Sequence, residues 1–241
     1  TSIAPDYVGV GVPGMGNNGG SGNPAAGGGA GSAGSGTTRG AGLANSITGS
    51  SVTYSTGGDS GTPVTANSGN GHGNGTAGDS GVVIVRTIIA GSAAGVAASG
   101  GTETTFVGDG TNGVSGQTYK VHTFTADGTL TVTAAGNVDA LVVGGGGGGA
   151  IGLSGGGGGG GSHLEITNAY LPAGALTCVV GAGGAGGITS YNLQAGPGNN
   201  GGASSIHNYY SPGGGGGASS GYTYNASTAP SMVGGNGSSG G

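Results

Sequence analysis

The stretch VDALVVGGGGGG, residues 138–149, joins an apolar run with strand character directly to six consecutive glycines. The same change of character recurs elsewhere: Val82–Val85 follows a glycine- and serine-rich region, and Leu176–Val180 leads into another one. Short apolar runs rich in valine and isoleucine are typical of buried β-strands. The chain therefore alternates between short strands and glycine-rich segments.

Glycine accounts for 70 of the 241 residues. Because ordering a backbone residue costs about 1–2 kcal/mol, and glycine loses the most entropy, these runs either stay disordered or gain hydrogen bonds from neighbouring segments. The ordered form open to them is polyglycine II, a helix with three residues per turn that can be approached from every side. Collagen is excluded because no Gly-X-Y period is sustained. We expect an all-β fold in which short antiparallel strands frame a layered bundle of polyglycine-II helices, with almost no α-helix.

Charged residues are sparse, with three Lys and Arg, eight Asp and Glu, and a formal net charge of −5. A chain this poor in charge, with near-neutral mean hydropathy, is expected to be ordered. Three cations cannot neutralise a run of phosphates, so we expect no nucleic-acid partner. No stretch reaches the roughly 18 apolar residues of a spanning helix, so we expect no membrane insertion. Cys178 is the single cysteine, and its apolar surroundings predict a small buried side chain.

Three regions follow from the distribution of apolar residues. Residues 1–89 form a glycine-rich segment that ends in a β-strand, and residues 90–117 are small, polar and expected to be a linker. Residues 118–241 are expected to form a β-meander followed by polyglycine-II segments. In this meander Asp127-Gly128 is a hairpin turn signal between two alternating runs. A second hairpin is expected to turn at residues 171–174.

Four strings in order resemble the opening of the glycine-rich domain of bacteriophage tail-fibre and adhesin proteins. They are YKVHTFTADGTLTVT (119–133), VDALVVGGGGGG (138–149), LPAGALTCVVGAGG (171–184) and GNNGGASSI (198–206). The closing segment of that family resembles GDSGVVIVRT, which stands here at Gly78–Thr87. The resemblance implies strands that lead into polyglycine-II helices, and a location outside the cell or on the virion surface.

The order of these elements departs from the family, because the closing segment comes first in this chain and the opening segment comes last. Residues 1–89 therefore resemble the C-terminal half of the domain, and residues 118–241 the N-terminal half. The chain is a window across two tandem domains, a permuted single domain, or a subunit whose first part completes the domain of a neighbour. The last arrangement is a head-to-tail contact that generates an open filament.

Catalytic signals are weak. Gly-Asp-Ser-Gly occurs at 58–61 and 78–81, but a serine protease also needs a histidine base, and His72 is the only histidine before Ser80. The four histidines, His72, His122, His163 and His207, are dispersed without metal-ligand spacing. We expect no enzyme activity, no catalytic residue, no metal and no cofactor.

Five tyrosines in the glycine-rich second half are candidate contacts with a receptor or with another subunit: Tyr191, Tyr209, Tyr210, Tyr222 and Tyr224. Tyrosine offers a large contact area at a low cost in conformational entropy. The alternative is that these rings only cover the polyglycine bundle or pack between subunits. Sequons at Asn74, Asn225 and Asn236 are candidate glycosylation sites.

The function expected from the sequence is that of a structural subunit of an extracellular or virion fibre. Its glycine-rich repeats would assemble head-to-tail by completing neighbouring domains, with the chain itself as partner. The alternative is a receptor-binding adhesin at a phage tail-fibre tip, which would contact a host surface receptor or glycan through its tyrosine-rich glycine loops.

Overall fold

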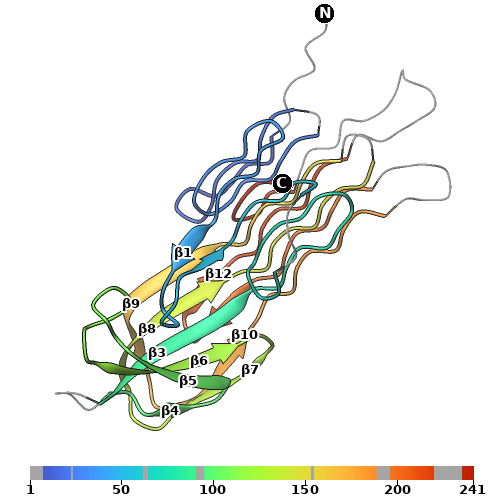
Figure 1. Cartoon of the computed structure of the whole chain (residues 1–241). Helices are drawn as coiled ribbons and strands as arrows, with labels where there is room; N and C mark the ends of the chain where they lie inside the picture. Colours follow the sequence, from blue (N-terminus) through green and yellow to red (C-terminus); the bar gives the residue numbers. More distant parts are fainter. Residues whose placement is uncertain are drawn as a thin grey trace, which may run out of the picture.

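The computed structural model describes residues 8–22, 24–61, 65–90, 95–152, 155–188, 196–219 and 235–241. The prediction of an all-β chain is confirmed: these residues contain twelve strands and no α-helix. The molecule is elongated, with two packed sheets at one end and glycine-rich backbone segments lying side by side at the other (Figure 1). No helix in the described part of the chain is long and apolar enough to cross a membrane.

The first sheet, the β3 sheet, has five antiparallel strands in the order β5-β6-β3-β8-β9. Their bounds are β3 Val82–Ala90, β5 Thr102–Val107, β6 Thr118–Phe124, β8 Gly136–Val143 and β9 His163–Leu171. The β3 strand lies in the centre although every other strand of the sheet comes later in the chain. Residues before 90 and after 117 therefore share one sheet.

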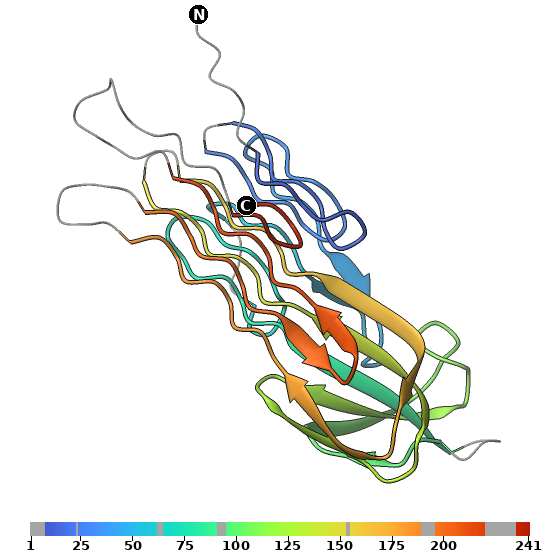
Figure 2. The same ribbon diagram turned by 180° about the vertical axis from the view of Figure 1, so that it is seen from behind.

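The second sheet, the β10 sheet, has five antiparallel strands in the order β12-β11-β10-β7-β4. Their bounds are β4 Ala98–Ser99, β7 Gly128–Val132, β10 Gly174–Val179, β11 Ser204–Ile206 and β12 Tyr209–Ser211. Figure 2 views the molecule from behind, and the β10, β11 and β12 strands (orange) lie there in front. The sheets enclose a core to which Val83 and Val85 contribute from one side, and Leu130, Cys178 and Ile206 from the other.

A hairpin forms a third layer on the outer face of the β3 sheet. It consists of β1 Leu43–Asn45 and β2 Val52–Tyr54. Ile47 and Tyr54 pack there against Val82, Ile84 and Leu141. Because alternate residues of a strand point to opposite faces, Val82 and Ile84 lie under the hairpin while Val83 and Val85 lie in the core between the sheets. Both faces of β3 are therefore buried along its first half.

The predicted meander is wrong in its pairing. Asp127-Gly128 does not close a hairpin, because β6 lies in the β3 sheet and β7 lies in the β10 sheet. The same is true of β9 and β10, whose connection at residues 171–174 passes from one sheet to the other. The strand boundaries are close to those expected. A meander would place β7 between β6 and β8, but β3 lies there instead.

Residues 90–117, expected to be a linker, contain β4 and β5. The β5 strand pairs with β6 along its whole length, from Thr102 opposite Thr123 to Val107 opposite Thr118. Threonine has a high β-propensity, which suits this strand. Five of its six residues are exposed because it lies at the edge of the sheet, so its composition is polar and resembles that of a loop.

Candidate functional site: the glycine lattice and the β3 strand

The glycine segments form a lattice around residues 144–151. The backbone N–H groups of this segment donate to three neighbouring segments in rotation. Residues 144, 147 and 150 donate to the carbonyls of 162, 159 and 156; residues 145, 148 and 151 to those of 202, 199 and 196; residues 146 and 149 to those of 79 and 76. The acceptor numbers fall as the donor numbers rise, so these neighbours run antiparallel. The three-residue rotation is that of a polyglycine-II helix.

The carbonyls of the same segment accept hydrogen bonds from three further segments. Residues 145 and 148 accept from 214 and 217, residues 146 and 149 from 184 and 187, and residues 147 and 150 from 72 and 75. Here both numbers rise together, so these neighbours run parallel. The central segment is thus surrounded by six neighbours, and the described glycine-rich segments lie side by side in Figures 1 and 2.

This packing explains why residues 144–149 are all glycine. A Cβ atom added to Gly147 would lie 2.0 Å from the carbonyl oxygen of Gly215, and one added to Gly148 would lie 2.1 Å from that of Ala185. Such contacts are far inside van der Waals distance, so any side chain would push two backbones apart. The steric reason is the one that requires glycine on the axis of collagen.

An outer segment of the lattice has a different pattern, Gly-Ala-Gly-Gly-Ala-Gly-Gly-Ile at residues 181–188. Its Ala182, Ala185 and Ile188 are exposed. The glycines between them face other backbones, since a Cβ on Gly183 would lie 1.8 Å from the carbonyl oxygen of Gly78. One position in three is therefore free to carry a side chain on this segment, whereas none of residues 144–149 of the central segment is.

Buried serines join the lattice to the strands. The hydroxyl of Ser204 donates to the carbonyl of Val143 at 2.6 Å and accepts from the N–H of Gly181 at 2.9 Å. The hydroxyl of Ser211 donates to the carbonyl of Ser162 at 2.9 Å. These bonds satisfy backbone groups where the two-residue period of a strand changes to the three-residue period of the glycine helix.

One histidine and one aspartate are buried inside the lattice. The Nε2 atom of His72 lies 3.0 Å from Oδ1 of Asp79, and their side chains are 2% and 3% exposed. The other carboxylate oxygen, Oδ2, accepts from the hydroxyl of Ser68 and the N–H of Thr65. The His72 backbone also belongs to the lattice, because its N–H donates to Gly147 and its carbonyl accepts from Gly158.

The Gly-Asp-Ser-Gly motifs do not assemble a protease site. His72 contacts Asp79 rather than a serine, and the Ser80 hydroxyl donates to Oδ1 of Asn67 at 3.0 Å. Asp59 of the first motif forms an ion pair with Arg39. Within the described ranges, no group of three or more His, Cys, Asp and Glu residues could hold a metal ion.

Burial shifts the pKa of two aromatic side chains next to the lattice. Desolvation lowers the pKa of His163 at the start of β9 and raises that of Tyr54 at the end of β2. Their ring centroids are 6.2 Å apart. In the core, burial raises the pKa of the Cys178 thiol to about 11, so this side chain is an unreactive core group as the sequence predicts.

The structure separates the candidate tyrosines. Tyr209 is half-buried and packs against the core between the sheets, whereas Tyr210 on the same strand is 60% exposed. Tyr191, Tyr222 and Tyr224 lie outside the described residues. Of the sequons, Asn74 and Asn236 are exposed, and Asn225 lies outside the described residues.

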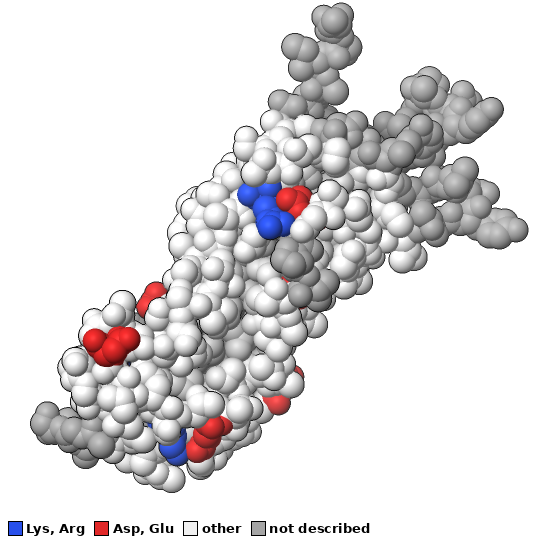
Figure 3. Space-filling view, in the orientation of Figure 1, with Lys and Arg blue, Asp and Glu red and all other residues white. Residues whose placement is uncertain are grey.

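On the face of the molecule seen in Figure 3, charged side chains occur in small separate groups among uncharged residues. Each of the three cations has an acidic partner: Arg39 with Asp59, Lys120 with Glu103, and Arg86 with Asp139. The Arg86 pair was not foreseen, although an arginine inside the apolar run VVIVRTII is an unusual residue for a central strand.

Residues 123–241 match a family model described as glycine-rich domain. The chain therefore contains a glycine-rich domain, and this match covers β7 to β12 and the central lattice segments. No curated protein matches the chain. No solved structure matches it either.

Proposed function

We propose that this chain is a structural subunit of a fibre outside the cell or on a virion. In this fibre the strand β3 of one subunit completes the β3 sheet of the next. The proposal includes no catalytic step, and the partner is another copy of the chain. The observation that supports it most directly is the position of β3, a nine-residue strand in the centre of a sheet whose other four strands come later in the chain.

Exchange between copies requires no new contact. The same pairs, such as Ile84 opposite Thr123 and Ile84 opposite Leu141, form whether β3 comes from the same chain or from a neighbour. Swapping an identical element between protomers is a low-cost route to assembly, and a head-to-tail swap that does not close gives a filament. The lattice supports the structural role. Each backbone hydrogen bond contributes only about 1 kcal/mol net to stability, and the lattice forms many of them together.

A cross-linking experiment tests the exchange. Thr87 lies opposite Lys120 in the β3–β6 pair, so Thr87→Cys and Lys120→Cys are prepared as separate chains in a Cys178→Ser background. After co-assembly and oxidation, we expect a disulfide between the two chains. A mixture of Thr87→Cys with Thr131→Cys is the control, because Thr131 is exposed on the other sheet.

The result that overturns the proposal is the absence of any cross-link between chains when a doubly substituted chain cross-links within itself. Electron microscopy of the same samples gives an independent readout: a continuous filament supports the proposal, and a monomer at all concentrations contradicts it.

A second candidate function is favoured by the exposure of Tyr210. An adhesin that contacts a receptor through tyrosine needs a ring at the surface, and Tyr210 provides one while Tyr209 does not. Tyr210→Ser is expected to reduce cell binding without loss of stability if this function holds. Unchanged binding excludes Tyr210 as the contact.

A further inference from the structure

Asparagine is followed directly by glycine at six places in the described chain: Asn18, Asn70, Asn74, Asn112, Asn200 and Asn236. In such a pair the backbone nitrogen of the glycine can attack the side-chain carbonyl carbon of the asparagine, because glycine has no side chain to obstruct the approach. The reaction requires this nitrogen to lose its proton and to move toward the side chain. A glycine N–H that is hydrogen-bonded to a fixed carbonyl is therefore protected, and it reacts only when the structure opens locally.

The lattice protects four of the six pairs, because the glycine N–H of each donates to a backbone carbonyl. These bonds run from Gly19 to Gly9, from Gly71 to Thr56, from Gly75 to Ala150 and from Gly201 to Gly214, with N···O distances of 2.8–2.9 Å. The protection does not depend on burial of the asparagine. Asn74, for example, is exposed, although the nitrogen of Gly75 is bonded.

The pair Asn236-Gly237 differs from these four. Asn236 is exposed, and the N–H of Gly237 has no hydrogen-bond partner among the described residues. The Oδ1 atom of Asn236 accepts one long hydrogen bond, from the N–H of Val10 at 3.4 Å. A loosely held side chain therefore lies next to a backbone nitrogen that no described carbonyl holds.

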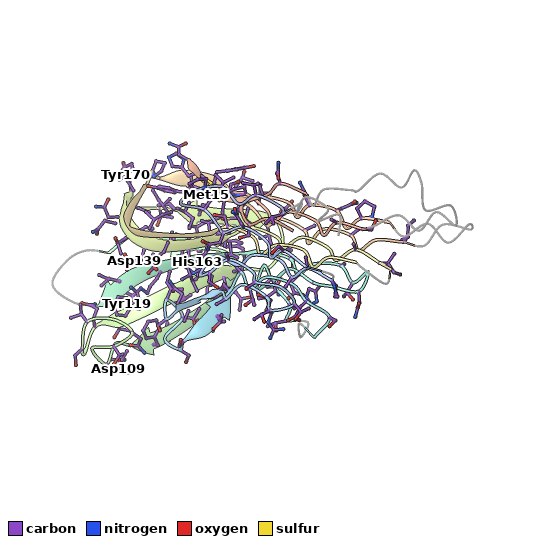
Figure 4. The ribbon with its side chains drawn as sticks, turned by 90° about the horizontal axis from the view of Figure 1, so that it is seen from above. Met15, Asp109, Tyr119, Asp139, His163 and Tyr170 are labelled. Atoms are coloured by element: carbon purple, nitrogen blue, oxygen red, sulfur yellow. The ribbon has the colours of Figure 1, made fainter. Side chains whose placement is uncertain are left out.

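The sixth pair, Asn112-Gly113, lies outside the lattice. It belongs to a turn held by the carboxylate of Asp109, at the end of the molecule that carries the two packed sheets (Figure 4). The N–H of Gly113 also has no partner in the described part of the chain. The Asn112 side chain is fixed, however, because its Nδ2 atom donates to the carbonyl of Gly49 at 2.7 Å and its Oδ1 atom accepts from the N–H of Asp109 at 3.2 Å. It is therefore less able than Asn236 to turn toward the attacking nitrogen.

We propose that Asn236 is a site of spontaneous deamidation in the folded protein. The nitrogen of Gly237 forms a bond to Cγ of Asn236, and the bond from Cγ to Nδ2 breaks. The departing amide group takes up the proton of the Gly237 nitrogen and leaves as ammonia, so that a cyclic succinimide remains. Water then opens the ring at either of its carbonyl carbons. One product is aspartate, and the other is isoaspartate, in which the backbone runs through the side-chain carbon.

Isoaspartate at position 236 would disturb the edge of the lattice. The N–H of Gly235 donates to the carbonyl of Gly216 at 2.7 Å, and the N–H of Ser238 donates to that of Gly213 at 2.8 Å. Isoaspartate adds a carbon atom to the backbone between these two bonds, so they cannot both keep their present spacing. The carbonyl of Ser238 also accepts from the N–H of Val12 at 3.0 Å, and this contact with the first part of the chain is expected to loosen as well.

Ageing of the full chain in mildly alkaline buffer tests the proposal, with peptide mass spectrometry as the readout. Deamidation is recognised by the mass change of replacing NH₂ by OH, and isoaspartate is distinguished from aspartate by peptide fragmentation. We expect the reaction at Asn236 to be about tenfold faster than at Asn74, where Gly75 must first be released by local opening. Asn74 is the matched control because it is also exposed and also followed by glycine. In denaturant the two rates should become nearly equal.

The proposal is overturned if Asn236 reacts no faster than Asn74 in the folded protein. It is equally overturned if the product at Asn236 is aspartate alone, because direct hydrolysis of the side-chain amide does not give isoaspartate. Asn236→Gln keeps an amide group but closes a less favourable ring, so this variant should lose the fast reaction and leave the rate at Asn74 unchanged.

Amide hydrogen exchange tests the effect on the lattice. Ser238 should exchange faster in the aged native chain than in Asn236→Gln aged in the same way. Equal exchange would overturn the predicted loosening of this segment. The inference does not rest on the fibre function, since it concerns the reaction of a single chain.

Discussion

The Nε2 atom of His72 lies 3.0 Å from Oδ1 of Asp79 within the glycine lattice, and both residues also hydrogen-bond to the lattice through their backbones. The second carboxylate oxygen of Asp79 accepts hydrogen bonds from the hydroxyl of Ser68 and the backbone N–H of Thr65, which come earlier in the chain than His72. The pair therefore fixes the return of the chain at residues 65–79 against the central segment.

Removing the carboxylate should destabilise the lattice strongly. Asp79→Ala leaves a buried imidazole nitrogen without its partner, and we expect a loss of about 3 kcal/mol in the free energy of unfolding. Asp79→Asn, which retains an acceptor oxygen, should lose less. Chemical denaturation measures both. Glu103→Ala removes an exposed ion pair and should leave the midpoint almost unchanged; an equal effect of Asp79→Ala and Glu103→Ala would contradict the role of His72–Asp79.

The lattice should distinguish central from outer positions. Gly147→Ala places a Cβ 2.0 Å from the carbonyl oxygen of Gly215, and we expect a loss of about 3 kcal/mol because two backbones must separate. Ala185→Ser, on the exposed side of an outer segment, should change stability by less than about 0.5 kcal/mol. Equal denaturation midpoints for the two variants would contradict the close backbone packing described for the central segment.

Acid should weaken the protein in two separate pH ranges. Burial lowers the pKa of His163 below its ordinary 6.5, with an opposing and smaller effect of Glu165. The unfolded chain therefore binds a proton that the folded chain refuses, and stability should fall as the pH drops below 6.5. Hydrogen bonds lower the pKa values of Glu103 and Asp109 from 4.5 and 3.8, so their contribution is lost only at more acidic pH.

Unfolding curves between pH 7 and pH 5 measure the contribution of His163. His163→Gln should flatten the dependence in this window. His207→Asn is the control, because His207 is exposed in the β11–β12 turn and asparagine tolerates its left-handed φ of 51°. An unchanged slope in His163→Gln would show that burial of this ring does not determine the pH dependence.

The core thiol should resist labelling in the folded protein. With the pKa of Cys178 raised to about 11, roughly one molecule in a thousand carries a thiolate at pH 8. Reaction with a disulfide reagent should be slow in buffer and rapid in denaturant. Thr177→Cys in a Cys178→Ser background moves the thiol to an exposed site on the same strand and should react at once. Fast labelling of native Cys178 would mean that the core between the sheets opens readily.

The sequence predicts the kinds of segment well because each is a local pattern. Runs such as Val82–Val85 and Val138–Val143 are strands, and uninterrupted glycine has few ordered alternatives to polyglycine II. The pairing of strands is not predictable in the same way. Asp127-Gly128 has the composition of a hairpin turn, but the long-range insertion of β3 beside β6 decides which strands pair.

The burial of the candidate tyrosines could not be predicted from the sequence. Tyr210 is exposed as a contact residue must be, whereas Tyr209 contributes to the core. The ion pair of Arg86 with Asp139 was not predicted, because β3 and β8 lie side by side in the sheet but far apart in the chain. A β-bulge at Asn168 leaves no recognisable local signal in the sequence.

The six-fold surroundings of residues 144–151 have a mechanical consequence. In a flat β-sheet the hydrogen bonds lie in one plane, so a shearing force can separate two strands along a single line. Around the central glycine segment, successive residues are tied to different neighbours in turn, and a load applied to it is shared around the full circumference. Because hydrogen bonds leave this segment in every direction, no single plane of weak contacts crosses the lattice, and it is expected to resist both tension and torsion.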